Sequence, residues 1–247
     1  MMKFKLISCE VIYREMCAAL ARARHHVDCE FLPKALHDAG AKEMLRLLQE
    51  AIDRVDSRKY DAVLLGYGLC GTGIAGLQAR ALPVVIPRVH DCIGLLMGGA
   101  ETYQLYFDTH SGVYFRSMGW LERAPDSGQS TLGPMKNKVA TGCSLAELIE
   151  RYGQDKGSYL FEQLNAYRNI YQQLTFIEIG LEPDASFEEL ARKEAGEHGW
   201  RFETMQGSMR MFEDLVRGDW DARDFLVLPP GSEVEACYDA SIMRVKK

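Results

Sequence analysis

Three of the seven cysteines, namely Cys9, Cys70 and Cys92, each adjoin a glycine or an acidic residue. Thiolate and imidazole groups are the ligands that zinc and iron–sulfur clusters prefer in proteins. Three thiolates with a fourth position, open or filled by histidine, would suit either a zinc ion or a [4Fe-4S] cluster. The three cysteines are therefore the predicted metal ligands, and the spacing leaves the choice between zinc and a cluster open.

Histidine and aspartate side chains accompany these cysteines. His90 and Asp91 directly precede Cys92, and His37 follows a separate apolar run. A histidine titrates near neutral pH, so either one could be a fourth metal ligand or a general acid/base. Asp91 could orient a histidine or carry a proton. The predicted catalytic residues are His90, His37 and Asp91.

A glycine motif surrounds the second cysteine. Residues 66–71 match G-x-G-x-x-G, and Asp91 follows after about twenty residues, the pattern of a dinucleotide site. The motif follows the third expected strand rather than the first, which weakens that interpretation. A milder one is that the glycines let backbone amides approach an anion or a cluster, with Arg88 binding a carboxylate or phosphate. The predicted cofactor-binding residues are Gly66, Gly68, Gly71 and Arg88.

Burial is the competing explanation for every one of these cysteines, because free cysteine is among the most buried residue types. No C-x-x-C pair is present. Three cysteines at the ends of expected strands nevertheless favour a functional site over simple burial of the three residues. Cys17, Cys29, Cys143 and Cys237 are expected to be structural. The aromatic stretch 103–115 is expected to belong to the core rather than to a stacking surface.

The elements that would position these residues alternate between strand and helix. Strands are expected at 5–8, 27–32, 61–65 and 82–86, with helices at 11–24 and 41–55. The last two strands are continuous apolar runs, typical of strands covered on both faces of a parallel sheet. Ligands bind outside the carboxyl ends of such strands, so the candidate residues would converge on one edge of the sheet.

The remainder of the chain is irregular and then alternates again. A helix is expected at 93–106, a short strand at 112–115, a surface loop at 125–138, and helices at 144–151 and 159–173. Strands at 175–179, 200–205 and 225–228 alternate with helices at 186–196 and 209–217. The predicted fold is α/β, with two Rossmann-like β-α-β-α-β halves of mainly parallel strands. Residues 1–120 would form the half that carries the Cys/His site, and 121–247 a linker, helices and the second half.

The overall composition indicates which classes of binding partner and which cellular location to expect. A net charge of -6 over 247 residues disfavours nucleic-acid binding, which needs a basic surface. No basic run suggests a membrane surface, and no segment approaches the ~20 apolar residues of a membrane helix. No signal peptide is recognisable. We therefore expect a cytoplasmic protein. The odd number of cysteines argues against a disulfide framework.

Several segments together resemble a prokaryotic family catalogued as domain of unknown function number 1638. The segments are 6–10, 31–38, 64–71, 86–92 and 218–231, which span nearly the whole chain. Family members tend to lie beside corrinoid proteins and their methyltransferases, especially in anaerobes, which implies one-carbon metabolism by association. Val89 stands where alanine is common in the family. The residues that match the family pattern are Cys9, His37, Cys70, His90, Asp91 and Cys92.

The first hypothesis is a metal-dependent enzyme (a lyase, hydrolase or methyl-transfer enzyme) that acts on a small metabolite in one-carbon or corrinoid-linked methyl metabolism. The alternative is a non-catalytic accessory protein that binds a corrinoid, a metal or a methyltransferase partner. A third hypothesis is a metal-free nucleotide-binding protein that uses residues 66–71.

Overall fold

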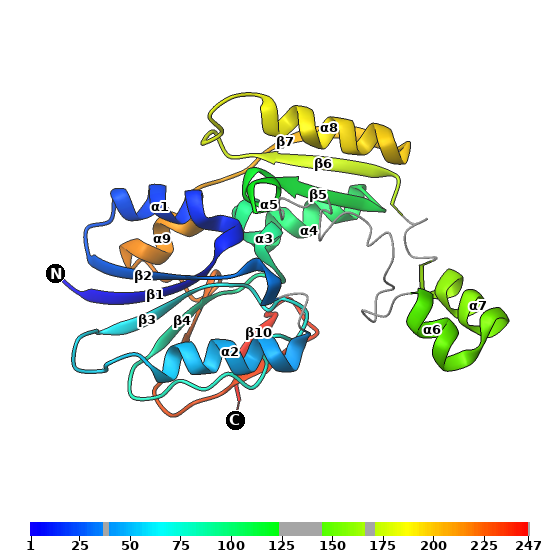
Figure 1. The fold of residues 1–247 in the computed structure, drawn as a ribbon. Helices are drawn as coiled ribbons and strands as arrows, with labels where there is room; N and C mark the ends of the chain where they lie inside the picture. Colours follow the sequence, from blue (N-terminus) through cyan, green and yellow to red (C-terminus); the bar gives the residue numbers. More distant parts are fainter. Residues whose placement is uncertain (37–39, 124–144, 166–170, 247) are drawn as a thin grey trace. The chain divides into compact units, whose positions relative to one another are not determined.

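The computed structural model describes residues 1–36, 40–123, 145–165 and 171–246 (Figure 1). Its strands are β1 (Lys3–Cys9), β2 (His26–Leu32), β3 (Ala62–Gly66), β4 (Val84–Pro87), β5 (Val113–Ser117), β6 (Gln173–Glu178), β7 (Arg201–Gln206), β8 (Phe225–Leu228), β9 (Val234–Ala236) and β10 (Met243–Val245). Its helices are η1 (Glu10–Ile12), α1 (Tyr13–Ala21), η2 (Lys34–Leu36), α2 (Ala41–Asp53), α3 (Cys92–Leu96), α4 (Ala100–Thr109), α5 (Met118–Glu122), α6 (Leu145–Tyr152), α7 (Gln154–Asn165), α8 (Ser186–His198) and α9 (Arg210–Arg217).

The fold is mixed α/β, with a mostly parallel five-stranded sheet in the order β2-β1-β3-β4-β8 and a parallel three-stranded sheet in the order β5-β6-β7. Strands β1 and β2, β1 and β3, and β3 and β4 pair in parallel. Strand β8 joins β4 in the antiparallel direction, with Val84 opposite Leu228. The prediction of an α/β fold with mainly parallel strands is therefore confirmed.

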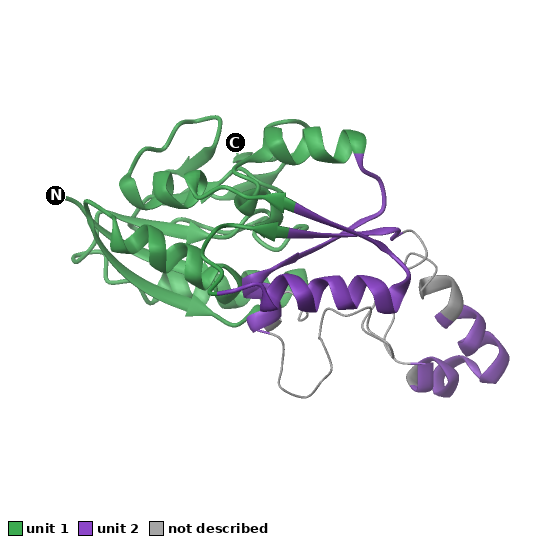
Figure 2. Cartoon of the chain, turned by 90° about the horizontal axis from the view of Figure 1, so that it is seen from above, with its two compact units in different colours: residues 1–109, 177–183, 205–247 green, residues 110–176, 184–204 purple. Residues whose placement is uncertain are grey.

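The chain forms two compact units, each assembled from segments that are separated in the sequence (Figure 2). Unit 1 contains residues 1–109, 177–183 and 205–247, and unit 2 contains residues 110–176 and 184–204. The C-terminal segment returns to unit 1 because β8 completes the five-stranded sheet. The division into halves 1–120 and 121–247 stays a prediction.

Unit 1 has its core on both faces of the five-stranded sheet. Helices α1 and α9 cover one face and α2 covers the other (Figure 1). Every residue of β3 and β4 is buried, as the continuous apolar runs predicted. Helix α2 buries Met44, Leu48, Ala51 and Ile52, which recur at helical spacing. The two central strands are thus fixed by apolar packing from both sides.

Unit 2 packs α8 against the three-stranded sheet. Leu174 and Phe176 contact Ala191 and Ala195, with half-buried aromatic residues such as Trp200 around them. Inside this unit the buried guanidinium of Arg116 pairs with Glu194 at 2.6 Å. Helices α6 and α7 lie close together, since a Cβ atom on Gly157 would come within 2.6 Å of the Ile149 backbone.

The structure contradicts the expectation of one helix at 93–106. The chain forms α3 and then α4, separated by Gly98 and Gly99, whose φ angles are 87° and 135°. Such angles are available to glycine at no steric cost and end a helix. No residue of α4 is buried, so the placing of its aromatic residues in the core is also wrong. The loop expected at 125–138 and Cys143 lie outside the described residues.

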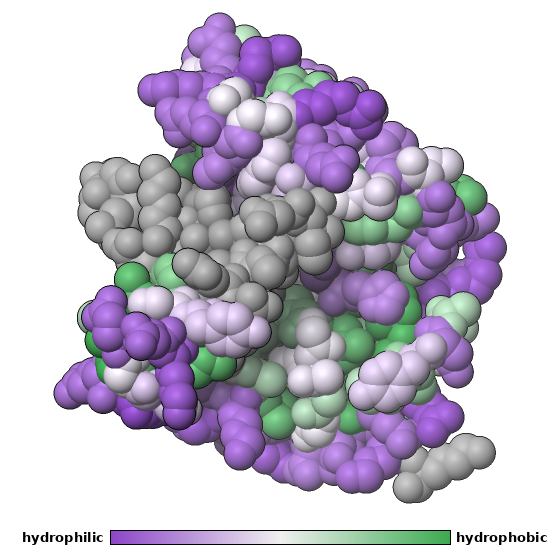
Figure 3. Space-filling view, turned by 90° about the vertical axis from the view of Figure 1, so that its right-hand side faces the viewer, coloured by the Kyte–Doolittle hydropathy of each residue, from purple (hydrophilic) through white to green (hydrophobic). Residues whose placement is uncertain are grey.

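The surface carries a small number of exposed apolar side chains. Leu105 on α4 is 63 % exposed and Tyr159 on α7 is 61 % exposed. On the face drawn in Figure 3, hydrophilic residues cover most of the surface and hydrophobic ones gather in the lower part of the view. Within the described parts of the chain, no helix is both long and apolar enough to cross a membrane.

Two glycines let the chain pack closely where β3 ends. A Cβ atom on Gly66 would lie 2.1 Å from the hydroxyl oxygen of Ser8, on the neighbouring strand. A Cβ atom on Gly68 would lie 2.7 Å from the carbonyl oxygen of Val89. Both positions therefore require glycine for close approach to neighbouring atoms, and neither needs a left-handed backbone.

We predict that Gly68→Ala lowers the free energy of unfolding by about 1–3 kcal/mol, because the added methyl group overpacks a tight contact. Gly196→Ala is the matched control. Gly196 lies within α8 with nothing near its Cβ position, so alanine there should stabilise the protein by about 0.5–1 kcal/mol. Urea unfolding of both variants measures the difference, and equal effects would contradict the close contact at Gly68.

Candidate functional site

The candidate site is built from the loops that follow β1, β3 and β4. These strands are parallel neighbours, so their carboxyl ends lie on the same edge of the sheet. The loop after β3 is bonded to the loop after β4 through two backbone hydrogen bonds. The N–H of Leu69 donates to the carbonyl of Val89 at 2.9 Å, and the N–H of Cys70 donates to that of His90 at 2.7 Å. These bonds place Cys70 beside His90 and Asp91.

Cys70 has an unusual backbone conformation. Its φ is 50°, in the left-handed region, and Gly71 follows with a φ of 72°. A non-glycine residue in that region is strained, and such residues cluster at functional sites. The backbone N–H of Gly68 donates to the Cys70 sulfur. The turn therefore directs the thiol of half-buried Cys70 toward the loop after β4, where the Asp91 carboxyl interacts with it electrostatically.

Cys9 is the last residue of β1 and its side chain is buried. The backbone N–H of Val11, in η1, donates to its sulfur. The Cys9 and Cys70 thiols also interact electrostatically. The structure thus brings together two of the three predicted thiol ligands, and each sulfur accepts a backbone hydrogen bond.

Burial controls the ionisation of both thiols. It raises the pKa of Cys9 to about 11, against the opposing effect of the Val11 N–H. Burial raises the pKa of Cys70 further still, and the negative charge of Asp91 adds to the shift. Both groups are therefore protonated thiols at neutral pH in the metal-free protein. Binding of a cation would have to displace their protons.

Tyr67 lies near these thiols and is 1 % exposed. Its hydroxyl faces the Cys9 thiol but makes no well-formed hydrogen bond to any residue in the described ranges. Burial, together with the nearby ionisable thiols, raises its pKa well above the usual value. A buried hydroxyl without a good partner carries a free-energy cost, and a bound ligand atom would remove that cost.

Asp91 connects the thiols to the start of α3. Its Oδ1 caps the helix by accepting from the N–H of Ile93 at 2.9 Å and that of Gly94 at 3.3 Å. Its Oδ2 accepts from the hydroxyl of Tyr103 at 3.4 Å. Burial raises the pKa of Asp91 above its ordinary value in spite of these bonds. Asp91 is thus a partly buried carboxyl group able to exchange a proton beside Cys70.

The loop after β2 brings a lysine close to Cys9. The backbone N–H of Lys34 donates to Oε1 of Glu10 at 2.7 Å, which joins this loop to the end of β1. Lys34 is buried, and its positive charge favours the thiolate form of Cys9, whereas the negative charge of Glu10 disfavours it. The two charges therefore act in opposite directions on the same thiol.

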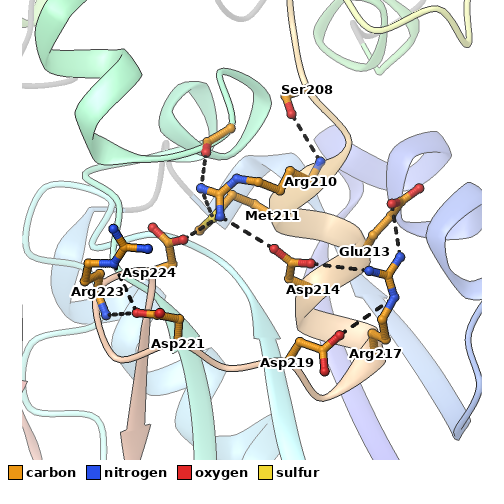
Figure 4. A network of polar contacts seen from close by, with 11 residues as sticks. Ser208, Arg210, Met211, Glu213, Asp214, Arg217, Asp219, Asp221, Arg223 and Asp224 are labelled. Carbon is orange, nitrogen blue, oxygen red and sulfur yellow. Dashed lines mark hydrogen bonds and ion pairs between the residues drawn. The ribbon is translucent and has the colours of Figure 1, made fainter.

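The turn between α3 and α4 is held in place by α9. Arg210 points between Asp214 and Asp224 (Figure 4), with its Nη1 2.5 Å from the Asp224 carboxylate. Its Nη2 donates to the carbonyl of Gly98 at 2.5 Å, and the N–H of Ser208 donates to the carbonyl of Leu96 at 2.8 Å. These bonds fix the start of α4 and thereby the position of Tyr103 against Asp91.

The third predicted ligand, Cys92, is buried as the first residue of α3 and interacts electrostatically with Tyr103. Across residues 1–36, 40–123, 145–165 and 171–246, no group of three or more His, Cys, Asp or Glu side chains is arranged to hold a metal ion. His90 is exposed, with its ring 5.8 Å from that of Tyr103. His37 lies outside the described residues. The metal and catalytic assignments stay predictions.

The predicted cofactor-binding residues have structural roles in the fold. Arg88 donates to the carbonyls of Phe225 at 3.3 Å and Ser241 at 3.0 Å, and also to that of Met243. Its guanidinium thus holds the C-terminal segment against β4. Gly66 and Gly68 serve close packing, and Gly71 continues the left-handed turn. Their role in binding a ligand is still a prediction.

The other cysteines differ in their surroundings. Cys237 is buried, as expected of a structural residue, and Cys17 is half-buried in α1. Cys29 lies on the edge strand β2 and is exposed. It is therefore no part of the core and offers an accessible thiol for comparison with Cys9 and Cys70.

Sequence reasoning missed Tyr67, Tyr103 and Lys34 as residues of the site. Tyr67 occupies the first x position of the G-x-G-x-x-G motif, a position at which any residue type fits. Nothing in the neighbouring sequence indicates that its hydroxyl faces Cys9. Tyr103 comes to the site only because α3 ends at the Gly98 turn. A lysine after Pro33 is an ordinary surface residue by type, so its burial could not be foreseen.

Comparison with known proteins identifies a family and nothing more specific. The family model described as "Protein of unknown function (DUF1638)" matches residues 31–216. No curated protein and no solved structure matches the chain.

The raised pKa of the Cys9 thiol predicts a loss of stability at alkaline pH in the metal-free protein. Below pH 9 the thiol is protonated in both the folded and the unfolded state, so its full contribution to the free energy of unfolding is present. Between pH 9 and about 11 the unfolded chain ionises first, so the folded state loses up to about 3 kcal/mol. Urea unfolding from pH 8 to 11 should show a shallower decline for Cys9→Ala than for the exposed control Cys29→Ala. The same slope in both variants would refute the shift.

Proposed function

We propose that this chain, which belongs to the DUF1638 family of proteins of unknown function, is an enzyme that acts on a small metabolite at the carboxyl edge of β1, β3 and β4. Cys9 and Cys70 are its central pair, with Tyr67 and Asp91 near them. We interpret unit 1 as a Rossmann-like half, in which this edge is the usual place for a ligand. The proposal extends to one-carbon or corrinoid-linked methyl metabolism through the family resemblance alone.

One observation carries this proposal. The thiols of buried Cys9 and half-buried Cys70 lie near enough for each to affect the ionisation of the other, while the buried hydroxyl of Tyr67 beside them lacks a well-formed bond to any described residue. A folded protein tolerates such a hydroxyl at a cost of about 1–3 kcal/mol. The left-handed backbone at Cys70 adds strain at the same place. The unsatisfied hydroxyl and the strained backbone both cost free energy at the same edge of the sheet. A bound ligand would offset part of this cost, which supports a ligand site there.

A zinc ion or an iron–sulfur cluster remains the proposed cofactor, and the described donors fit it in part. Cys9 and Cys70 both accept a backbone N–H bond at sulfur, an arrangement that stabilises thiolate ligands. The described residues supply no third donor arranged with these two. When bound, such a metal would act as a Lewis acid toward water or the substrate. We assign no reaction step to it.

The proton-transfer roles are proposed for groups at the mouth of this pair. Burial raises the pKa of Asp91, and its carboxyl group lies near Cys70, so it is the proposed group that exchanges a proton with a substrate. The exposed ring of His90 lies on the same loop and is the proposed route by which that proton reaches solvent. Tyr67 would donate its hydroxyl to a ligand atom between the thiols.

The alternative is a non-catalytic accessory protein that binds a corrinoid, a metal or a methyltransferase partner. The protonated state of both thiols favours this alternative, because a thiol with a raised pKa is a weak nucleophile. Titration with cobalamin, followed by absorbance, separates the two proposals: binding without turnover of any substrate supports the accessory role. Nucleotide binding at 66–71 has less support, since the amides of Leu69 and Cys70 already donate within the protein.

The deciding experiment is metal and sulfide analysis of protein purified without oxygen, together with its absorption spectrum. Iron, sulfide and broad absorbance near ~400 nm would establish a cluster. Stoichiometric zinc without colour would point to activation of water or a substrate thiol. Absence of both would remove the metal from the proposal and leave the thiol pair as a direct ligand site.

We predict that Cys70→Ser loses at least half of any bound metal and reduces activity or ligand binding more than tenfold while the fold is retained. The reason is that Cys70 lies in the pair, whereas its backbone conformation is equally available to serine. The matched control is Cys17→Ser on α1, which should keep both properties. Circular dichroism checks the fold of each variant. Equal metal contents in the two variants would overturn the assignment of Cys70.

A further inference from the structure

A pocket lies beside the last turn of α2 in unit 1, away from the candidate site. It encloses about 430 Å³, open to solvent, and has room for a small metabolite. Lys5, on β1, is one of its walls and precedes Cys9 by four residues, so the Cα atoms of the two lie about 13 Å apart along the strand. The residues that line the pocket are Lys5, Glu30, Ala51, Arg54, Val55, Asp56, Lys59 and Tyr60.

Charged side chains occupy this part of the sheet, where apolar ones would be expected to pack under the helix. Lys5 is on β1, an interior strand, and its side chain is only 17 % exposed. Helix α2 contributes the short side chain of Ala51, and Val55 follows the helix, so no large apolar group fills the space. A lysine held this far from water requires negative charge close to it.

Glu30 supplies part of that negative charge. Its carboxylate lies 3.1 Å from Nζ of Lys5 and 2.8 Å from Nη2 of Arg54. Partial burial raises the pKa of Glu30, but the bonds from Lys5 and Arg54 outweigh burial and hold that pKa below its ordinary value. Glu30 is thus ionised at neutral pH, and one carboxylate faces two cations. One positive charge is left without a counterpart.

Lys59 adds a second positive charge in excess. The other acidic residue of the lining, Asp56, is already neutralised by Arg58, whose side chain donates to its two oxygens at 3.0 and 3.1 Å and does not line the pocket. The exposed ammonium of Lys59 makes no hydrogen bond or ion pair with any residue that the structure describes. The pocket therefore holds two positive charges more than its own carboxylates balance.

We propose that this pocket binds a phosphate group, either free or in a small monoester, through Lys5, Arg54 and Lys59. A phosphate carries close to two negative charges at neutral pH, which matches the excess. Its several acceptor oxygens suit N–H donors that come from a strand, a helix end and a loop better than the two oxygens of one carboxylate do. Ala51 and Val55 would contact the carbon atoms of a monoester.

The test is calorimetric titration of the intact protein with inorganic phosphate, phenyl phosphate and malonate, the last a dianion without phosphorus. We expect both phosphates to bind with dissociation constants below about 1 mM and more tightly than malonate. Tighter binding of phenyl phosphate would identify a monoester as the ligand, whereas equal binding would identify free phosphate. Malonate binding as tightly as either phosphate, or no phosphate binding, would overturn the proposal.

Lys59→Gln should weaken phosphate binding about tenfold, as expected for the loss of one charged hydrogen bond. Because this ammonium makes no bond within the described part of the chain, its loss should leave the fold intact. The matched control is Arg46→Gln, which removes the same charge from an exposed position of α2 outside the pocket. Its phosphate affinity should be unchanged, and equal effects of the two substitutions would reduce the site to non-specific attraction and refute it.

Cys70→Ser separates this pocket from the proposed function. The variant should bind phosphate as tightly as the unaltered protein, whatever it does to metal content. Loss of phosphate binding in Cys70→Ser together with full binding in Lys59→Gln would assign the anion to the thiol site and overturn the pocket beside α2.

Discussion

Two backbone hydrogen bonds, from Leu69 to Val89 and from Cys70 to His90, join the loops at the ends of β3 and β4. A parallel sheet aligns its strand ends but leaves the following loops free to diverge. These two bonds prevent that divergence, and they require Gly68 because its neighbour Val89 leaves no room for a Cβ atom. The left-handed turn at Cys70, the position of its thiol and the proximity of Asp91 all follow from this junction. Hydrogen bonds between the backbones of the two loops, more than contacts between side chains, therefore determine the geometry of the candidate site.

The sequence predicted the parallel part of unit 1 because the information there is local. Buried runs such as residues 63–66 are apolar at every position but the last, and α2 repeats its apolar residues at helical spacing. The antiparallel entry of β8 was not predictable, since it depends on pairing with a strand far away in the chain. The break at Gly98 was visible as a glycine pair, yet glycine alone does not distinguish a tolerated residue from a helix end.

The site was predictable in its residue types and only in part in its geometry. Cys9 ends β1 and Cys70 follows β3, and because these strands are parallel neighbours the two residues lie toward one edge of the sheet. Cys92 follows β4 equally closely, but it begins a helix, and in that helix it interacts with Tyr103. The burial of Lys34 and of the Tyr67 hydroxyl, which lacks a well-formed hydrogen bond to the described residues, depends on packing by several segments at once. Such features decide the pKa of each thiol and cannot be deduced from spacing.

The pairing of β4 with β8 has a consequence for how the protein is made. During synthesis β4 emerges from the ribosome long before β8, so it remains an unpaired edge of the growing sheet while unit 2 is translated. An unpaired apolar strand is a template for intermolecular pairing. The closing strand must also find its partner over a long stretch of sequence, which slows folding. Completion of unit 1 is thereby coupled to the synthesis of β8, which closes the edge that β4 otherwise exposes.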